Sequence, residues 1–200
     1  MDYPVTFSVD YPETLNRWTT GFRIILAIPI ILILALLGST SGGFRILLLG
    51  STSVVFLPTV LLLLIRYKYP RWWFDFALNL VRFEARGTAY VFLLRDEYPS
   101  VDDDQAVHLD VPYPNVEADL NRWLPLVKWL LAIPHYIVLF FLEIAAFFAV
   151  IVTWFAILFT GRYPRDIFSF VEGVFRWHNR VAAYAFVLVT DRYPPFRLAP

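Results

Sequence analysis

Two pairs of arginines are the side chains in this sequence best suited to bind a ligand. Arg82 and Arg86 form the first pair, and Arg176 and Arg180 form the second. Residues four apart lie on one face of a helix, and arginine binds phosphate oxygens through paired hydrogen bonds. The spacing therefore favours a site for the phosphates of anionic lipid headgroups. Anchoring beside a membrane, with pairing to acidic residues on the same helices, is the simpler explanation of the same arginines.

A second set of cations lies at the start of two long apolar runs. It consists of Arg17, Arg23, Arg122 and Lys128, and the last two follow the first two at an offset of 105 residues. These side chains would contact lipid headgroups if they reach the membrane surface. A long cationic side chain can also extend along an apolar surface to place its charge in water. In either case, a charge repeated just inside an apolar run indicates that it has a partner.

His135 and Glu143 are the polar residues of the second apolar run. An ionisable side chain within a membrane span is by default a candidate functional site. The two residues are eight apart, about two helical turns, so a proton relay between them is one hypothesis. The other hypothesis places Glu143 at a turn that water and headgroups reach, and His135 against another helix.

The sequence carries no pattern typical of catalysis or of metal binding. It has no cysteine, and His108, His135 and His178 lack the spacing of metal ligands. A glycine-rich phosphate loop, a GxSxG elbow and an HExxH motif are also missing. We therefore expect a non-enzymatic protein without a catalytic residue, metal or cofactor. The formal net charge of zero argues against a nucleic-acid partner.

The composition is typical of a membrane protein. Hydrophobic residues make up 58% of the 200 residues, and the mean hydropathy is +0.58. Charged residues make up 17%, against roughly a quarter in soluble domains. The first residues are acidic and lack the basic and apolar regions of a signal peptide, so no signal peptide is expected.

Two apolar stretches, residues 18–65 and 124–160, are expected to form transmembrane hairpins. About 20 helical residues cross a bilayer core of about 30 Å. The first stretch contains Pro29, which should kink its first helix, and it breaks at the Gly/Ser-rich residues 38–43. The second stretch would be about 55 Å long as one helix, so we place a turn at or beside Glu143. The predicted fold is an α-helical integral membrane protein with four transmembrane helices.

Each predicted hairpin is followed by an amphipathic helix and a strand-like run. Charged residues recur at helical spacing over residues 71–86, where Gly87 should end the helix, and residues 165–180 repeat this frame. The two helices either lie in the membrane interface or cover one face of a small sheet, and one helix can do both. Four strands are expected to form one or two small cytoplasmic sheets, at residues 5–9, 88–95, 107–111 and 182–190.

The chain is a tandem duplication. Leu120–Trp123 repeats Leu15–Trp18 letter for letter, and Leu131–Pro134 repeats Leu26–Pro29, both at an offset of 105 residues. The predicted domains are therefore two repeats with a short linker, at residues 1–99, 100–106 and 107–200.

The duplication also predicts a topology. Each repeat contains an even number of predicted spans, so both repeats share one orientation, unlike the inverted repeats of many transporters. Sixteen of the 17 lysines and arginines lie on the side of the termini, and Arg45 is the exception. The positive-inside bias then predicts a multi-pass protein with both termini in the cytoplasm.

The repeat unit resembles a known bacterial family. The sequence YPRDIFSFVEGVFRW, followed by RVAAYAFVLVTDRYPPF, resembles the bacterial membrane family called domain of unknown function 4389. LNRW with KWLLAIPHYIVLFFLEIAAF is similar to the apolar hairpin of that family. Residues 109–196 are the more similar half, whereas the first half departs at its inserted Gly/Ser turn and at Glu84-Ala85. The resemblance implies a protein of the bacterial inner membrane, and it supplies no activity.

Together these patterns favour a scaffold or accessory subunit of a membrane complex. The cytoplasmic strands and amphipathic helices would form a docking surface. The expected partners are membrane lipids and either other membrane subunits or further copies of the chain. The alternative function is anionic-lipid binding or small-solute transport that uses the repeated arginines.

Overall fold

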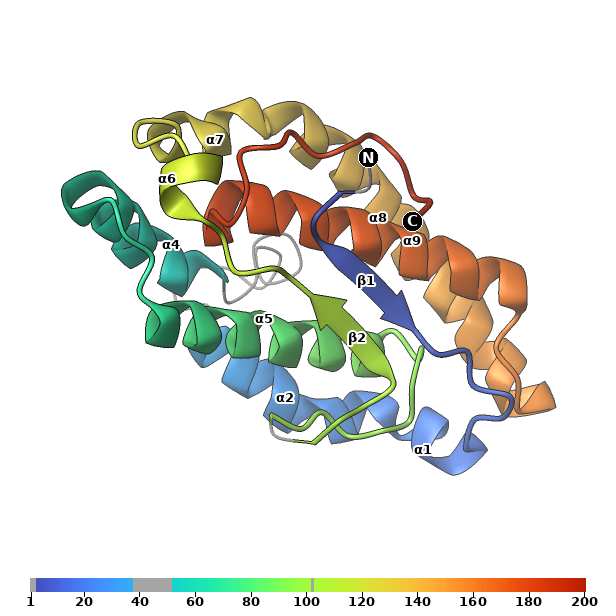
Figure 1. The fold of residues 1–200 in the computed structure, drawn as a ribbon. Coiled ribbons are helices and arrows are strands. Elements are labelled where there is room, and N and C mark those ends of the chain that lie inside the picture. The colour runs from blue at the N-terminus through green and yellow to red at the C-terminus, as the bar shows by residue number, and fades with distance from the viewer. Residues whose placement is uncertain (1–2, 38–51, 102) are drawn as a thin grey trace.

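The structure, a computed structural model, describes residues 3–37, 52–101 and 103–200 (Figure 1). The elements of the first repeat are β1 (Thr6–Val9), α1 (Arg17–Gly21), α2 (Arg23–Leu37), α4 (Thr52–Leu61), the π-helical turn η1 (Leu62–Arg66) and α5 (Arg71–Val91). Those of the second repeat are β2 (Val107–Asp110), α6 (Val116–Asp119), α7 (Pro125–Leu131), α8 (Ile133–Thr160), α9 (Arg165–Ala182) and the π-helical turn η2 (Ala183–Val187).

These elements stack in three layers (Figure 1). β1 and β2 form a two-stranded antiparallel ribbon on one side. The amphipathic helices lie beneath it, α9 against β1 and α5 against β2. The apolar helices form the third layer, in which α8 packs on α9 and α2 packs on α5. Each strand therefore packs on the amphipathic helix of the other repeat.

The ribbon is centred on Phe7 and Leu109, which hold equivalent positions in the two repeats and lie opposite each other. The Nε atom of Arg176 donates to the Phe7 carbonyl oxygen at 2.8 Å. The Nε atom of Arg82 donates to the Leu109 carbonyl oxygen at 3.0 Å. Alternate strand side chains point into the core, as the apolar–polar alternation of residues 5–9 and 107–111 predicts. A pseudo-twofold axis at this residue pair relates the two repeats.

The two amphipathic helices are confirmed, and they are longer and more buried than predicted. α5 extends to Val91 and α9 extends to Ala182. Both cover the inner face of the ribbon, and the side chains of Ala77, Val171 and Val174 are inaccessible to solvent. An interfacial helix would leave one apolar face to lipid. Here the ribbon occupies one face of each helix and the apolar layer occupies the other.

The strands predicted at residues 88–95 and 182–190 are wrong, because helical structure continues into both segments. Gly87 does not end α5. It lets α2 approach, since a Cβ atom there would lie 3.1 Å from Ile30 Cγ2 and 3.2 Å from Leu34 Cδ1. Each helical segment is instead followed by a leucine in the left-handed conformation, Leu93 with φ of 64° and Leu188 with φ of 61°. That conformation costs an ordinary residue about 1–2 kcal/mol, so tertiary packing imposes these turns.

The prediction of four transmembrane helices is also wrong. Among the described residues, α8 alone is long and apolar enough to cross a membrane, with 28 residues. The first apolar stretch contributes shorter apolar helices, Arg23–Leu34 and Val55–Arg66. The predicted turn at residues 38–43 and the position of Arg45 lie outside the described residues.

α8 replaces the second predicted hairpin with one continuous helix through Glu143. Pro134 lies in its first turn, where a missing backbone N–H costs nothing, and Gly161 ends it in the left-handed conformation with φ of 74°. The Glu143 carboxylate is held by α9, as described below, so it needs no turn to reach water. A charged residue in an apolar run therefore indicated a partner rather than a break.

The two arginines of the ribbon should differ in their effect on stability. Arg176 is buried and also contacts the Leu198 carbonyl oxygen at 2.9 Å and Glu172 at 2.7 Å, whereas Arg82 is partly exposed. Arg176→Met should therefore lower the free energy of unfolding by about 3 kcal/mol, and Arg82→Met by about 1 kcal/mol. Denaturant unfolding in detergent, followed by circular dichroism, measures both values. Equal, small losses would show that the buried cross-repeat bond does not stabilise the fold.

Candidate functional site

A buried charged pair lies between α8 and α9. Glu143 Oε1 lies 2.9 Å from His178 Nδ1, and the side chains are 5% and 18% exposed. The buried residues of α8 include His135, Leu139, Glu143 and Ala146, which form one helical stripe. The prediction that Glu143 lies at a solvated turn is therefore wrong, since it lies within the helix and faces α9.

The environment of His178 favours its charged form. Burial by itself lowers the pKa of the imidazole. The hydrogen bond and negative charge of Glu143, together with the charge of Glu84, outweigh burial and raise the pKa above its usual value. Glu84 lies on α5, at the position that His178 occupies in the second repeat. One imidazole thus links three helices electrostatically.

His135 makes a separate contact with α9. Its Nδ1 atom accepts a hydrogen bond from Trp177 Nε1 at 3.0 Å, and its ring stacks on Phe196 with 3.9 Å between centroids. In the part of the chain that the structure describes, the Nε2 atom of His135 has no hydrogen-bond partner. His135 and Glu143 share one stripe of α8, but different α9 residues engage them. A proton relay between the two stays a hypothesis.

Sequence reasoning missed Trp177 and His178 as partners in this cluster. The sequence offered one signal for them, which was their position. Both residues follow Arg176 on a helix whose apolar spacing predicts that one face is buried. The way in which α9 packs against α8 is a tertiary property that spacing does not contain. Over the described ranges, no group of three or more His, Asp or Glu side chains is arranged to hold a metal ion.

The cations at the start of each apolar run form ion pairs with the segment that ends the same repeat, which we call its tail. Arg23 forms an ion pair with Asp96 and donates to the Arg95 carbonyl oxygen at 3.2 Å. Its guanidinium also lies 4.1 Å from the centroid of the Tyr90 ring. The second oxygen of Asp96 accepts a hydrogen bond from the Asn16 backbone N–H at 2.7 Å. These contacts fix the start of the first apolar run to the segment after α5.

Lys128 repeats this arrangement in the second half. Its Nζ atom lies 2.7 Å from Asp191 Oδ1 and donates to the Thr190 carbonyl oxygen at 2.7 Å. It also lies 5.2 Å from the centroid of the Tyr184 ring, and Asp191 accepts a hydrogen bond from the Asn121 N–H at 2.6 Å. Lys128 is inaccessible to solvent. Burial lowers its pKa, and Asp191 opposes this shift through its hydrogen bond and charge.

The remaining cations predicted to bind headgroups also contact the protein itself. Arg122 donates to the Leu64 carbonyl oxygen at 2.7 Å, and Arg17 lies against Gly161 at the end of α8. Arg86 donates to the Ser100 carbonyl oxygen at 2.6 Å, and Arg180 donates to the Ala199 carbonyl oxygen at 3.0 Å. With the two ribbon arginines, all eight predicted cations thus have a contact within the fold. Lipid binding by these residues stays a prediction.

The Glu143–His178 pair should make stability depend on pH. Because the folded-state pKa of His178 is raised, the pair contributes fully below pH 6.5 and loses its contribution as pH rises through the folded-state value. Glu143→Gln should flatten this profile and lower the free energy of unfolding at pH 6 by about 3 kcal/mol. Denaturant unfolding between about pH 5.5 and 9 measures both effects.

His108 provides a matched control, because its Nε2 atom lies 3.3 Å from Asp10 on the exposed face of the ribbon. His108→Gln should change stability by less than about 0.5 kcal/mol across the same range. A Glu143→Gln variant that keeps the wild-type pH profile would rule out the buried pair as its source.

Comparison with known proteins finds one family. Residues 123–197 match the family described as domain of unknown function (DUF4389). The match spans α7, α8, α9, η2 and the segment after η2, and it therefore includes the Lys128–Asp191 and Glu143–His178 pairs. Neither the curated proteins nor the solved structures compared with the chain include a match. Residues 123–197 are therefore similar to this family of unknown function, over a stretch that contains the YPR motif of the second repeat.

Proposed function

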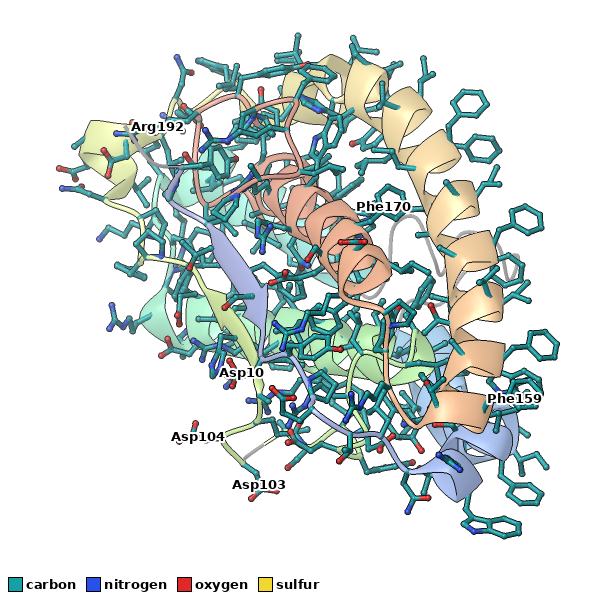
Figure 2. The ribbon with its side chains drawn as sticks, turned by 90° about the vertical axis from the view of Figure 1, so that its right-hand side faces the viewer. Asp10, Asp103, Asp104, Phe159, Phe170 and Arg192 are labelled. Carbon is teal, nitrogen blue, oxygen red and sulfur yellow. The ribbon has the colours of Figure 1, made fainter. Side chains whose placement is uncertain are left out.

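We propose that the protein is a membrane-bound scaffold or accessory subunit, without enzymatic activity, whose apolar layer lies in the bilayer. The outward face of α8 carries this proposal. Its large apolar side chains are each more than half exposed, namely Ile137, Phe141, Phe148, Val152, Phe155 and Phe159. Figure 2 shows Phe159 pointing away from the body of the protein, opposite to Asp103 and Asp104. This end of the apolar face and the two aspartates thus lie on opposite sides.

The exposed apolar surface continues beyond α8. The stripe from Ile137 to Phe159 is about 33 Å long at the rise of an α-helix. Further exposed side chains extend it over α1, α2, α7 and the residues just before α7, including Trp18, Ile24, Ile28, Leu32, Trp123, Leu126 and Leu130. Monomeric soluble proteins rarely expose contiguous apolar patches above a few hundred Å². The two tryptophans stand where interfacial aromatic residues are expected. The exposed face of the apolar helices is therefore better suited to contact with lipid than with water.

In this proposal α8 lies along the membrane rather than across it. The ribbon and α9 lie alongside α8, not beyond its ends, and Figure 2 shows Asp10 at a level between those ends. If α8 stood upright, the open edges of the ribbon would lie at bilayer depth, where unpaired backbone groups are very unfavourable. A flat α8 buries its apolar face and leaves the ribbon in water. We infer that this membrane is the bacterial inner membrane, from the resemblance of the repeat unit to a bacterial membrane family.

The ribbon supports a docking role on the wet side. Thr6, Ser8, His108 and Asp110 project outward from the two strands and are exposed. Arg82 and Arg176, beneath the ribbon, bind its carbonyl oxygens. The ribbon therefore presents a polar surface that is held rigidly from below. Such a platform suits a second membrane subunit or another copy of the chain.

Glutamates on the outer face of α8 should release the protein from membranes. The variant Phe141→Glu/Phe148→Glu/Phe155→Glu loses about 2 kcal/mol of apolar burial at each site. The fraction that floats with liposomes after detergent removal should fall at least tenfold.

The ribbon and the segment before β2 offer a control of equal charge, the ribbon variant Thr6→Glu/Ser8→Glu/Val101→Glu. This variant should float like the wild type but lose any subunit that co-purifies in fixed stoichiometry at endogenous expression, as measured by native mass spectrometry. Unchanged flotation of the α8 variant would refute membrane binding through this face. A fixed partner that is retained by the ribbon variant would refute docking on the ribbon.

A further inference from the structure

An open cleft of about 620 Å³ lies where η1 leads into α5. One wall is the segment Tyr67–Pro70, and the other is the segment Tyr113–Glu117, which leads into α6. Small-molecule sites typically enclose about 300–1,000 Å³. The cleft is therefore large enough to hold a small polar group, and none of the contacts described so far fills it.

The cleft lies where the two repeats differ. The first repeat passes from Tyr11 to Asn16 in five residue steps, whereas the second passes from Tyr113 to Asn121 in eight. The additional residues coil into α6, whose first turn forms part of the wall. The shared architecture of the repeats does not require this helix.

The charges at this corner are also arranged differently. At the equivalent corner, Arg165 Nη2 lies 3.6 Å from the Glu13 carboxylate. The corresponding residues at the cleft are Arg71 and Asn115, and an amide cannot neutralise a guanidinium. Both guanidinium groups lie over a tyrosine ring, Arg71 at 4.6 Å from the Tyr113 centroid and Arg165 at 4.8 Å from the Tyr11 centroid. The acidic group near Arg71 is Asp75, at 4.0 Å, and both side chains are more than half exposed. The cleft therefore has beside it a largely exposed guanidinium that is only loosely paired.

Lys68 and Glu117 add one charge of each sign to the cleft walls. Neither side chain has a hydrogen bond or ion pair to any residue that the structure describes. The tyrosine hydroxyls are occupied, since Tyr67 donates to the Leu120 carbonyl oxygen at 2.7 Å and Tyr113 donates to the Tyr69 carbonyl oxygen. What remains for a ligand is an ammonium, a carboxylate and aromatic ring surface.

The cleft adjoins the apolar layer. Ile65, two residues before Tyr67, is 69% exposed, and Trp123 is 68% exposed. Arg122 connects the two, because its guanidinium donates to the Leu64 carbonyl oxygen at 2.7 Å. If the apolar layer lies in the bilayer, the cleft opens at the depth of the headgroups.

We propose that this cleft binds the headgroup of a zwitterionic phospholipid, an inference that rests on the membrane-bound function proposed above. Lys68 and Arg71 would hold the phosphate through charge-assisted hydrogen bonds. Glu117 and the tyrosine rings would hold the headgroup ammonium, the rings through cation–π attraction. A purely anionic headgroup would leave Glu117 facing like charge.

The test separates the headgroup from the membrane surface. Titration calorimetry in detergent with glycerophosphocholine, the soluble headgroup, should show binding that Lys68→Gln/Glu117→Gln weakens at least tenfold. The same variant should float less with phosphatidylcholine liposomes and unchanged with phosphatidylglycerol liposomes. Arg162→Gln/Glu13→Gln removes one charge of each sign at the equivalent corner, and it should behave as the wild type in every assay.

Each other outcome has a distinct meaning. A cleft variant that binds the soluble headgroup as tightly as the wild type overturns the site. A wild type that prefers phosphatidylglycerol, with the preference lost in Lys68→Gln alone, overturns the zwitterionic assignment in favour of an anionic headgroup. A wild type that floats with both lipids but does not bind glycerophosphocholine also refutes the cleft. A wild type that floats with no liposome refutes the membrane-bound function itself.

Discussion

Each strand of the ribbon is held by an arginine from the other repeat, and the rest of the structure depends on this exchange. An isolated two-stranded ribbon is at best marginally stable in water. Arg176 and Arg82 bind the carbonyl oxygens of Phe7 and Leu109, the residue pair at the pseudo-twofold axis. These bonds keep α9 under β1 and α5 under β2, so each repeat completes the core of the other. A single repeat would leave its strand without the helix that covers it.

Within each repeat, a buried ion pair fixes the start of the apolar run to the segment that ends the repeat. Removing a cation from water costs several kcal/mol, and only close partners of opposite charge offset that cost. Lys128 has Asp191 and a carbonyl oxygen at 2.7 Å each, and Arg23 has the equivalent partners in the first half. Such a pair tolerates little displacement, because separation would leave a charge buried alone. The pairs therefore specify where each apolar helix meets the tail of its repeat.

Local patterns in the sequence predicted where helices and strands lie better than they predicted what each element packs against. The strands at residues 5–9 and 107–111 and the two amphipathic helices follow from spacing alone. Residues 88–95 were misread as a strand because aromatic and branched side chains favour strands, while packing against α2 at Gly87 keeps the segment helical. Glu143 was misread as a turn because a single helix over residues 124–160 would be about 55 Å long, more than a bilayer needs. Its partner His178 lies 35 residues away, and only the packing of α9 on α8 shows that the carboxylate is paired.

The positions at which the repeats differ are the ones that the fold does not explain. Contacts made in both halves, such as those of Arg23 and Lys128, are accounted for by the shared architecture. Glu143–His178 has no such counterpart, since the first repeat carries Glu84 where the second carries His178. α6 likewise has no counterpart between Tyr11 and Asn16. Both features belong to the second repeat, which also contains the long apolar helix. The Glu143–His178 pair and α6 are thus additions of the second copy, and α6 forms part of a cleft whose other wall, Tyr67–Pro70, comes from the first copy.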